Sequence, residues 1–482
     1  MKAKKKTALI SGNFNILHPG HLRLFQFAKE NADTLIVAVT ENSAPGVTIP
    51  QSLRAEALMG LKSVDKVLKI TDGLEATIRQ IAPDIIIKGK EFASRENLED
   101  KLAAELGINL LFSSGEISFS ATKLMSLEED NNNNFTPADP SVAPYIKRHK
   151  ISLELISNKI AKIQNLKVLV IGDLIVDKYV FCDPIGMSQE DPTIVIKALQ
   201  EKKFLGGAGI VAAHAAALGA NSSFVGLVGD DDAAPYAKSC LKNYNVSSHL
   251  ITDTTRPTTT KTRFRASDKT MLRVNQLREH DLVGLPLLET KKVIAKLAPD
   301  ADVILFSDFS YGLLTQEIIE FTLSNISRKN TFLAGDSQSS SQMGDLSKFV
   351  KMNLVAPTER EARLATNNKN SSLPELAKEL RKKFQHDHII LTMGSEGVIV
   401  TSLAIDELTD RLPALENKVI DVAGAGDSMF AASSLGLAAG MSIWEAALFG
   451  SIIASKQVGQ LGNRPIPIES INQRVKETFG FQ

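Results

Sequence analysis

Short runs of β-branched and aliphatic residues alternate with helical segments along most of this chain. Thr34–Val39, Val303–Phe306 and Ile389–Leu391 are examples of the apolar runs. Such alternation predicts parallel sheets covered by helices on both faces, because parallel strands need crossover connections that helices provide. We therefore expect an α/β fold, with ligands bound at the carboxyl ends of the strands.

The asparagine- and proline-containing segment Glu128–Pro144 is the clear break in composition. Its asparagine run cannot contribute to a hydrophobic core, and its prolines stiffen the exit from the segment. A chain of 482 residues with 43% hydrophobic residues is long enough and apolar enough for two cores. We predict one domain over residues 1–128, a linker over 129–147 and a second domain over 148–482.

Bulk composition excludes several classes of function. Lys+Arg and Asp+Glu are equal at 55 each, so no excess charge favours nucleic acid or an anionic membrane as a partner. Cys182 and Cys240 are the two cysteines; they predict neither a disulfide framework nor a zinc site, and they favour a reduced, cytoplasmic setting. The apolar region Met429–Ala454 is interrupted by Ser442 and Glu445, which predicts two buried helices instead of a membrane span.

The stretch Asp421-Val-Ala-Gly-Ala-Gly-Asp-Ser428 places two glycines and a carboxylate directly before a segment of helical composition. Unpaired N–H groups at a helix start attract an anion, and Gly424 and Gly426 allow tight backbone geometry there. Asp427 stands where it could take a proton from a substrate hydroxyl. This pattern favours a kinase site; the alternative is a glycine-containing turn with an aspartate helix cap.

The N-terminal segment Thr7–His21 contains a second pattern of this kind. A strand ends at Gly12, a loop with Phe14 follows, and His18 and His21 stand at the start of an amphipathic helix. Two imidazoles three residues apart lie on one side of a helix, where both can donate to phosphate oxygens with help from the helix dipole. The alternatives are surface histidines or a metal pair, and metal is disfavoured because neither a cysteine nor a third histidine lies nearby.

From about Leu166 to Ser470 the chain resembles the ribokinase-like (PfkB) sugar kinases. The segments that carry the resemblance are, in chain order, Lys167–Asp173 with Asp177 following, Leu205–Gly209, Leu227–Asp230, Ser307–Asp308, Thr358–Glu361, Leu391–Gly397 and Asp421–Ser428. The resemblance implies transfer of the γ-phosphoryl group of ATP to a sugar hydroxyl, with Asp427 as the base and Glu361 helping to hold Mg²⁺ through water. The substrate-binding residues it implies are Asp173, Asp177, Gly206, Gly207, Arg273 and Asp308. The nucleotide-binding residues it implies are Thr392, Gly394, Gly397, Gly424, Ala425 and Gly426.

From about Lys5 to Leu127 the chain resembles the HxGH nucleotidyltransferases, which have a Rossmann-like fold. Besides the histidine pair, the matching segments are the arginine helix Ser52–Leu58, the strand Ile85–Gly89 and Ser120–Leu124. The resemblance implies attack of a sugar 1-phosphate on the α-phosphorus of a nucleotide, with release of pyrophosphate. The resemblance implies that His18 and His21 are catalytic and stabilise the transition state. The residues that it assigns to the nucleotide and its phosphates are Gly12, Phe14, Lys88, Ser120 and Thr122.

Together the two halves resemble the bifunctional enzymes of ADP-heptose synthesis, in which a heptose 7-phosphate kinase normally precedes a heptose 1-phosphate adenylyltransferase. Here the order is reversed. The resemblance implies ATP and Mg²⁺, with CTP possible for the transferase half, a small sugar phosphate as substrate, and a homodimer formed through the kinase domain. Two alternatives stay open: a cytidylyltransferase for a polyol or sugar phosphate joined to a kinase of different specificity, or one active transferase with a non-catalytic kinase-like dimerisation module.

The chain departs from the heptose kinases mainly on the sugar side. Ile210 replaces an asparagine, Tyr311 and Gln338 replace lysines, Ala423 replaces a threonine, and Thr358 replaces the asparagine of the metal motif. The absence of these two lysines weakens the expected binding of a sugar phosphate, because lysines bind phosphate as positive point charges. A basic group that could compensate, or could be a solvated strand face, consists of Lys261, Arg263, Arg265 and Arg273. In the transferase half, Asn15 replaces an aspartate.

Overall fold

The computed structural model describes residues 6–15, 17, 19–89, 98–113, 142–191, 193–266, 269–338, 344–402, 408–415 and 418–480. The chain divides into two compact units, which consist mainly of residues 1–136 and 137–482. Most of the predicted linker lies outside the described residues. Its last part belongs to helix α6 (Ala143–Arg148), whose Tyr145 is buried in the core of the second unit.

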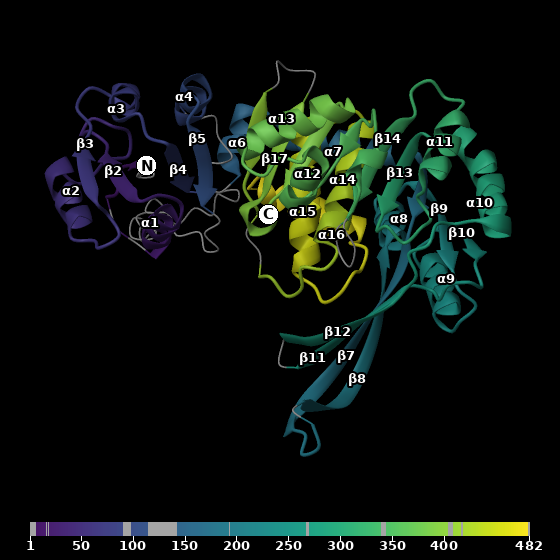
Figure 1. Cartoon of the computed structure of the whole chain (residues 1–482). Helices are drawn as coiled ribbons and strands as arrows, with labels where there is room; N and C mark the ends of the chain where they lie inside the picture. The colour runs from purple at the N-terminus through teal and green to yellow at the C-terminus, as the bar shows by residue number, and fades with distance from the viewer. Residues whose placement is uncertain are drawn as a thin grey trace. The chain divides into compact units, whose positions relative to one another are not determined.

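The first unit is built on a parallel sheet with strand order β3-β2-β1-β4-β5 (Figure 1). The strands are β1 (Thr7–Gly12), β2 (Thr34–Val39), β3 (Lys66–Lys69), β4 (Ile85–Gly89) and β5 (Asn109–Ser113), and the helices are α1 (Pro19–Asn31), α2 (Gln51–Met59), α3 (Leu74–Ile81) and α4 (Leu98–Leu106). The order in which the strands are added to the sheet reverses between β1 and β4. In open α/β sheets, ligands commonly bind at the carboxyl ends of the strands at such a point. Gly12 and Lys88 stand at the carboxyl ends of these two strands.

The second unit has a larger sheet with strand order β10-β9-β6-β13-β14-β15-β16-β17-β18. It is parallel from β10 through β16, and β17 and β18 are antiparallel. Its strands are β6 (Lys167–Gly172), β9 (Asn221–Val228), β10 (Ser247–Thr252), β13 (Val303–Asp308), β14 (Phe332–Ser337), β15 (Leu354–Val355), β16 (His388–Thr392), β17 (Val398–Ser402) and β18 (Thr409–Leu412). Both sheets have the α/β architecture that the alternating pattern predicts.

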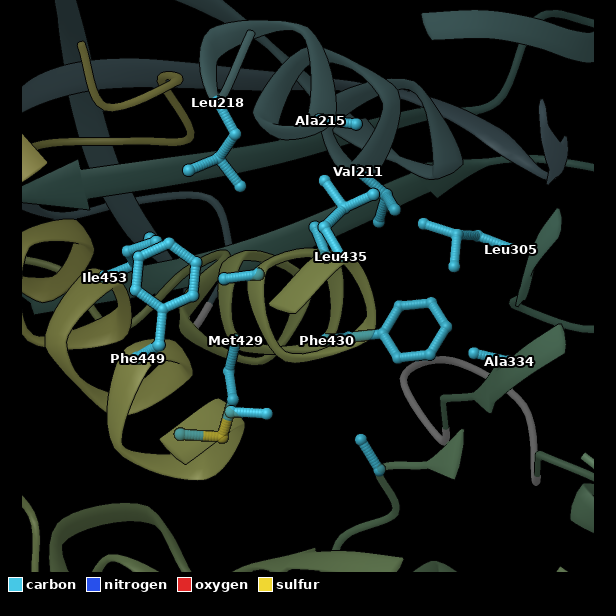
Figure 2. Packing of buried hydrophobic residues seen from close by; sticks show 14 of the residues in the cluster. Val211, Ala215, Leu218, Leu305, Ala334, Met429, Phe430, Leu435, Phe449 and Ile453 are labelled. Carbon is cyan, nitrogen blue, oxygen red and sulfur yellow. The ribbon is translucent and has the colours of Figure 1, made fainter. Parts of the chain in front are cut away.

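Helices cover this sheet, and two of them form the central packing layer. The helices after α6 are α7 (Leu153–Ile163), α8 (Ala208–Ala217), α9 (Ala233–Asn243), α10 (Gly284–Leu297), α11 (Gln316–Ser324), α12 (Glu359–Thr366), α13 (Leu373–Phe384), α14 (Ala425–Ala438), α15 (Ile443–Val458) and α16 (Ile468–Thr478). Helix α14 packs against α8, α15 and strands β13 and β14. In Figure 2, Phe430 of α14 points toward Leu305 and Ala334 of the strands.

The apolar region Met429–Ala454 forms two buried helices, as predicted. Gly440, whose φ is 91°, separates them, and Ser442 and Glu445 form a capping box that starts α15. Small side chains fill most of α14, so its neighbours approach closely on every side. Within the part of the chain that the structure describes, no helix has the length and hydropathy needed to cross a membrane.

A separate four-stranded sheet extends from the second unit (Figure 1). Its strand order is β12-β11-β7-β8, and the strands are β7 (Leu174–Met187), β8 (Ile194–Gly207), β11 (Thr260–Ala266) and β12 (Lys269–Gln276). Strand β7 begins two residues after β6 ends, and β8 runs directly into α8. The base of this sheet is therefore anchored at the carboxyl edge of the large sheet, where the predicted kinase site lies.

Candidate active sites

The loop before α14 has the geometry that its glycines predict. Gly424 is the N-cap of α14 and has a φ of 77°, in the left-handed region that favours glycine. A Cβ atom at this position would also overlap Oδ1 of Asn463. The first turn of α14 therefore follows Gly424 and carries Ala425, Gly426 and Asp427. The N–H of Ala425 donates to the backbone oxygen of Val422 at 3.4 Å, and those of Gly426 and Asp427 have no carbonyl one turn earlier in the helix.

The carboxyl group of Asp427 is buried in this first turn, with 6% of the residue exposed. Its Oδ1 accepts a hydrogen bond of 2.5 Å from Nε2 of Gln338. Burial raises the pKa of Asp427 to about 6; the Gln338 hydrogen bond and Lys261 oppose this rise, and Asp177 adds to it. A carboxylate with such a pKa is still mostly ionised at neutral pH and is a stronger base than an exposed aspartate.

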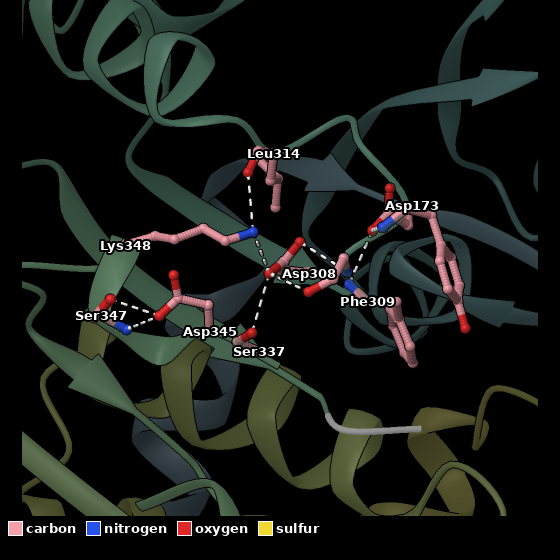
Figure 3. A network of polar contacts seen from close by, with 10 residues as sticks. Asp173, Asp308, Phe309, Leu314, Ser337, Asp345, Ser347 and Lys348 are labelled. Carbon is pink, nitrogen blue, oxygen red and sulfur yellow. Dashed lines mark hydrogen bonds and ion pairs between the residues drawn. The ribbon is translucent and has the colours of Figure 1, made fainter. Parts of the chain in front are cut away.

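Two of the predicted substrate-binding aspartates lie side by side at the ends of β6 and β13 (Figure 3). Oδ2 of Asp308 accepts from Nζ of Lys348 at 2.7 Å and from Oγ of Ser337 at 3.0 Å. Oδ2 of Asp173 accepts from the backbone N–H groups of Phe309 at 2.8 Å and Tyr311 at 3.2 Å. Burial and the nearby Asp308 carboxylate raise the pKa of Asp173 to about 6.

The glycine pair at the end of β8 is required by the close approach of these aspartates. A Cβ atom on Gly206 would lie 2.6 Å from Oδ2 of Asp177, and one on Gly207 would overlap the backbone oxygen of Asp173. Asp177 also forms an ion pair with Nη1 of Arg263. The structure thus brings together Asp173, Asp177, Gly206 and Gly207, which the sequence motifs singled out separately.

The basic group on β11 turns toward this site. Lys261, Arg263 and Arg265 alternate along the strand, so their side chains share one face of the sheet. Nζ of Lys261 lies 5.0 Å from the ring centroid of Phe309 and 5.3 Å from that of Tyr311, and its charge acts on Asp427. Nη1 of Arg265 lies 3.7 Å from Asp421. Arg273, which is paired with Arg263 across the strands, is exposed on β12.

A second acidic group lies next to Asp427. Burial, together with the nearby Glu361 and Asp427 carboxylates, raises the pKa of Asp336 well above its usual range. Glu361 is the third residue of α12, and its Oε2 accepts from the backbone N–H of Thr358 at 2.8 Å in a capping box. Thr358, which replaces the asparagine of the family motif, thus acts as the helix cap. Among the described residues, no three His, Cys, Asp or Glu side chains are grouped to hold a metal ion.

The predicted nucleotide-side glycines form a tight turn between β16 and β17. Gly394 and Gly397 have φ values of 59° and 89°, and a Cβ atom on Gly397 would overlap the backbone oxygen of Leu412. Thr392 ends β16, and its backbone N–H donates to the oxygen of Pro357 at 2.8 Å. The turn therefore needs glycine for its own geometry, whatever binds beside it.

In the first unit, His21 forms a three-ring cluster with Phe14 and Phe25, whose own ring centroids are 5.9 Å apart, near the end of β1. Its ring centroid is 5.2 Å from that of Phe14, edge to face, and 6.3 Å from that of Phe25 in a stacked arrangement. Phe14 has a φ of 51°, and its ring lies 3.1 Å from where a Cβ atom on Gly12 would be. His18, Ser120 and Thr122, which the sequence also assigns to this site, lie outside the described residues.

Lys88 is held by an acidic partner that sequence reasoning missed. Its Nζ donates to Oε1 of Glu99 at 2.7 Å, and Oγ of Ser11 donates to the same oxygen at 2.7 Å. Burial alone would raise the pKa of Glu99, but the Lys88 charge and these hydrogen bonds outweigh burial and lower it. The available signal was an acidic residue in the first turn of α4, which is common in helices and therefore not specific.

Arg54 and Asn15 shape the loop that follows β1. Arg54 is fully buried, and its guanidinium donates to the backbone oxygens of Asn13 at 2.6 Å, Thr40 at 2.8 Å and Ile49 at 2.6 Å. Oδ1 of Asn15 accepts from the N–H of Thr48 at 3.0 Å. These contacts fix the loop at the carboxyl end of β1.

Comparison with solved structures supports the fold of the second unit. Phosphofructokinase-2 from Escherichia coli, in complex with substrates and products, matches with a TM-score of 0.54 and 16% identity over 64% of this chain and 98% of its own. A ribokinase from Arabidopsis thaliana complexed with ribose and ATP matches with a TM-score of 0.52 and 17% identity over 65% of this chain and 99% of its own. The predicted ribokinase-like α/β fold is confirmed.

Sequence comparison finds curated relatives that are named as bifunctional. The bifunctional protein HldE of Helicobacter hepaticus is 31% identical over 62% of this chain and 61% of its own length. The protein of the same name from Pelobacter propionicus is 31% identical over 67% of this chain and 65% of its own. The protein of the same name from Nitratiruptor is 29% identical over 64% of this chain and 64% of its own length. The chain thus spans somewhat less than two thirds of the length of these relatives.

Two family descriptions match separate parts of the sequence. Residues 9–109 match the family described as cytidylyltransferase-like, which covers β1 through the start of β5 and agrees with the predicted nucleotidyltransferase fold. Residues 165–470 match the family described as pfkB family carbohydrate kinase, which covers the large sheet and the four-stranded sheet. This chain therefore belongs to the pfkB family of carbohydrate kinases.

Proposed function

We propose that this protein is a bifunctional transferase that phosphorylates a sugar phosphate and also transfers a nucleotidyl group, producing ADP-heptose or a related ADP-sugar. The observation that carries the proposal is the match of one chain to both a carbohydrate kinase and a nucleotidyltransferase family, with bifunctional HldE relatives at about 30% identity. We also propose that the two domains stand in the reverse of the usual order in such enzymes.

In the proposed kinase step, a sugar hydroxyl attacks the γ-phosphorus of ATP while Asp427 takes the hydroxyl proton, and ADP leaves. The burial of Asp427 and its pKa of about 6 support this role. The first-turn amides that follow Gly424 would stabilise the charge that develops on the transferred group.

The basic residues of β11 support an anionic sugar as the kinase substrate. Lys261, Arg263 and Arg265 face the aspartates of the site from β11, and Lys261 is buried against the ring of Tyr311. Tyr311 stands where the heptose kinases have a lysine, so Lys261 restores a positive charge close to that position. We therefore favour a sugar phosphate over a neutral sugar.

In the proposed transferase step, a sugar 1-phosphate oxygen attacks the α-phosphorus of the nucleotide and pyrophosphate leaves. His21, together with His18, would donate to the phosphate oxygens. Lys88, at the same edge of the sheet, would bind the phosphates, and its ion pair with Glu99 fixes the position of its ammonium group. The Phe14 and Phe25 rings restrict rotation of the His21 imidazole.

The oxygen donors of the second unit suit Mg²⁺, which prefers carboxylate and water ligands. Glu361 would hold the ion through water, because one of its carboxylate oxygens caps α12. When bound, Mg²⁺ supplies positive charge to the nucleotide phosphates. A reduced, cytoplasmic setting is part of the proposal, and both cysteines are free.

We propose a homodimer formed through the four-stranded sheet. Leu272 and Val274 of β12 lie on one face of that sheet and are 54% and 43% exposed. Exposed apolar side chains at this spacing favour contact with another protein surface. A second copy of the chain would cover them.

The second candidate function is a cytidylyltransferase joined to a kinase of different specificity. The description of the family that matches residues 9–109 favours CTP as the nucleotide. One experiment separates the two functions. The purified protein is incubated with a panel of sugar and polyol phosphates and with each nucleoside triphosphate, and the products are identified by mass spectrometry. ADP-heptose as the main product supports our proposal; a CDP-linked product supports the alternative; no product in any combination contradicts both.

A further inference from the structure

Gln338 bridges two buried carboxyl groups in the candidate kinase site. It follows directly after β14, and its Nε2 donates to Oδ1 of Asp427 at 2.5 Å and to Oδ2 of Asp336 at 3.0 Å. An amide nitrogen carries two hydrogens, so one Gln338 side chain can serve both acceptors. Asp336 and Gln338 belong to one strand end, and Asp427 belongs to α14.

The backbone of Gln338 is fixed independently of this bridge. Its N–H donates to the backbone oxygen of Asp308 at 2.9 Å, which continues the pairing of β13 with β14. A Cβ atom on Gly344 would lie 2.8 Å from the backbone oxygen of Ser337, so the returning chain packs closely against this strand end. The side chain therefore starts from a rigid position, and its reach toward Asp427 is determined by the sheet.

Burial disfavours the ionised form of both acceptors. The pKa of Asp336 is raised well above its usual range by burial and by the Glu361 and Asp427 carboxylates, and its Oδ2 accepts the Gln338 hydrogen bond whether or not the group is ionised. The pKa of Asp427 is raised to about 6. The ionisable groups that act on Asp427 are Asp177 of β7, Lys261 of β11 and Asp336 of β14.

We propose that Gln338 is a positioning residue for the kinase base: it holds Oδ1 of Asp427 with a neutral amide and leaves Oδ2 to accept the proton of the sugar hydroxyl. The inference deepens the proposed function and rests on the role of Asp427 as the base. A neutral donor orients the carboxylate without supplying a full positive charge that would weaken it as a base. Asp336 accepts the second hydrogen bond from the Gln338 amide, and this contact keeps the amide from rotating away from Asp427.

The test compares two substitutions at position 338, which should shift the pKa of Asp427 in opposite directions: one removes the hydrogen-bond donor and the other gives it a positive charge. Gln338→Leu removes both hydrogen bonds at similar volume, and Gln338→Lys replaces a neutral donor with a charged one. Gln316→Leu is the matched control, because it removes an amide hydrogen bond to Glu320 on the exposed face of α11. For each protein, kcat and KM are measured against pH with heptose 7-phosphate and ATP.

In a plot of kcat against pH, we expect the midpoint of the acid limb to move up by about half a pH unit to one pH unit in Gln338→Leu. In Gln338→Lys it should move down by about the same amount. In Gln338→Leu, kcat should fall at least about tenfold near neutral pH while KM for ATP changes little, because the lost contact acts on the base. Gln316→Leu should match the wild type. A positioning role would be contradicted if the Gln338 variants lost the same fraction of kcat at every pH, or if only their KM changed.

A direct titration separates failure of this inference from failure of the proposed function. The Asp427 carboxyl carbon is followed by NMR in protein labelled at aspartate, and its signal is assigned by its absence from Asp427→Asn. Opposite shifts of its titration midpoint in the two Gln338 variants support the contact even if heptose 7-phosphate is not phosphorylated, in which case the proposed function fails by itself. An unchanged midpoint in both variants overturns the inference.

Discussion

The carboxylate of Asp427 is placed where water cannot stabilise its charge. Because its folded-state pKa is raised to about 6, the folded protein binds more protons than the unfolded chain between the two pKa values, and the ionised carboxylate lowers stability above this range. Asp427→Asn should therefore raise the free energy of unfolding by about 1 to 3 kcal/mol near pH 8, and the gain should vanish as the pH falls toward about 4. Thermal melts at several pH values measure this difference.

The same substitution should reduce phosphorylation by about 10² to 10⁴-fold while ATP binding, followed by calorimetry, is retained. Asp281→Asn, at an exposed loop carboxylate, is the matched control and should change neither stability nor activity. If Asp427→Asn loses ATP binding together with activity, the residue acts in binding and not as the base.

His21→Ala should lower nucleotidyl transfer by about 10² to 10³-fold, because in the proposed transferase step His21 donates to the reacting phosphate. The phosphorylation rate of the same protein is the internal control and should stay nearly unchanged, since Asp427 belongs to the other compact unit. Pyrophosphate release is the measurement. Normal release by a variant that lacks both His18 and His21 would remove the assignment of this site.

Sequence motifs predicted these side chains unequally well. Asp173, Asp177 and the glycine pair could be predicted because they stand in local motifs that resemble those of the sugar kinases. The structure gives the physical reason for the glycines, since a Cβ atom at either would meet Asp177 or the backbone of Asp173. Lys348 and Glu99 left no such pattern. Each reaches its partner from a segment whose position depends on tertiary packing, as the Lys348–Asp308 and Glu99–Lys88 contacts show.

At the scale of elements, the proposed dimer contact lies on the four-stranded sheet of the second unit. We expect Leu272→Arg to convert a dimer into a monomer, because a buried, unpaired guanidinium would be costly at a subunit contact. Leu285→Arg is the matched control: Leu285 is 75% exposed at the start of α10, outside that sheet. Light scattering after size-exclusion chromatography measures the mass. A wild type that is already monomeric, or two variants with the same mass, would contradict this dimer.

The alternating pattern predicted the large sheets well, because parallel strands such as Val303–Asp308 are buried on both faces and read as continuous apolar runs. It did not predict the extent of β7 and β8. Their outer halves are exposed, mix charged residues such as Lys197 and Glu201 with exposed apolar ones such as Ile185 and Leu199, and pair mainly with each other. Such strands carry little hydrophobic periodicity from which to predict them.

At the scale of the whole molecule, the two reactions should be separable. Cleavage at a protease site introduced within Asn131–Pro140 should yield two folded fragments, each retaining its own reaction. The fragments from this cleavage are compared with those from a cut after Lys150. The cut after Lys150 removes α6, whose Tyr145 is buried and donates to the backbone oxygen of Trp444 at 3.2 Å, together with His149, which stacks on the Trp444 ring.

The kinase fragment that begins after Lys150 should therefore melt at a lower temperature than the one that keeps α6. Differential scanning calorimetry of both fragments gives the comparison. If the fragment with α6 aggregates or does not melt cooperatively, the domain boundary is wrong.

The most direct test of the central claim follows two labels through one preparation of the full chain. Heptose 7-phosphate is supplied with ATP labelled on the γ-phosphate, and heptose 1-phosphate is supplied separately with ATP labelled on the α-phosphate. We predict label on the sugar in the first reaction and on ADP-heptose in the second, with Asp427→Asn losing only the first and His21→Ala only the second. Absence of label from both products in the wild type, or loss of both reactions in either variant, would contradict two independent active sites.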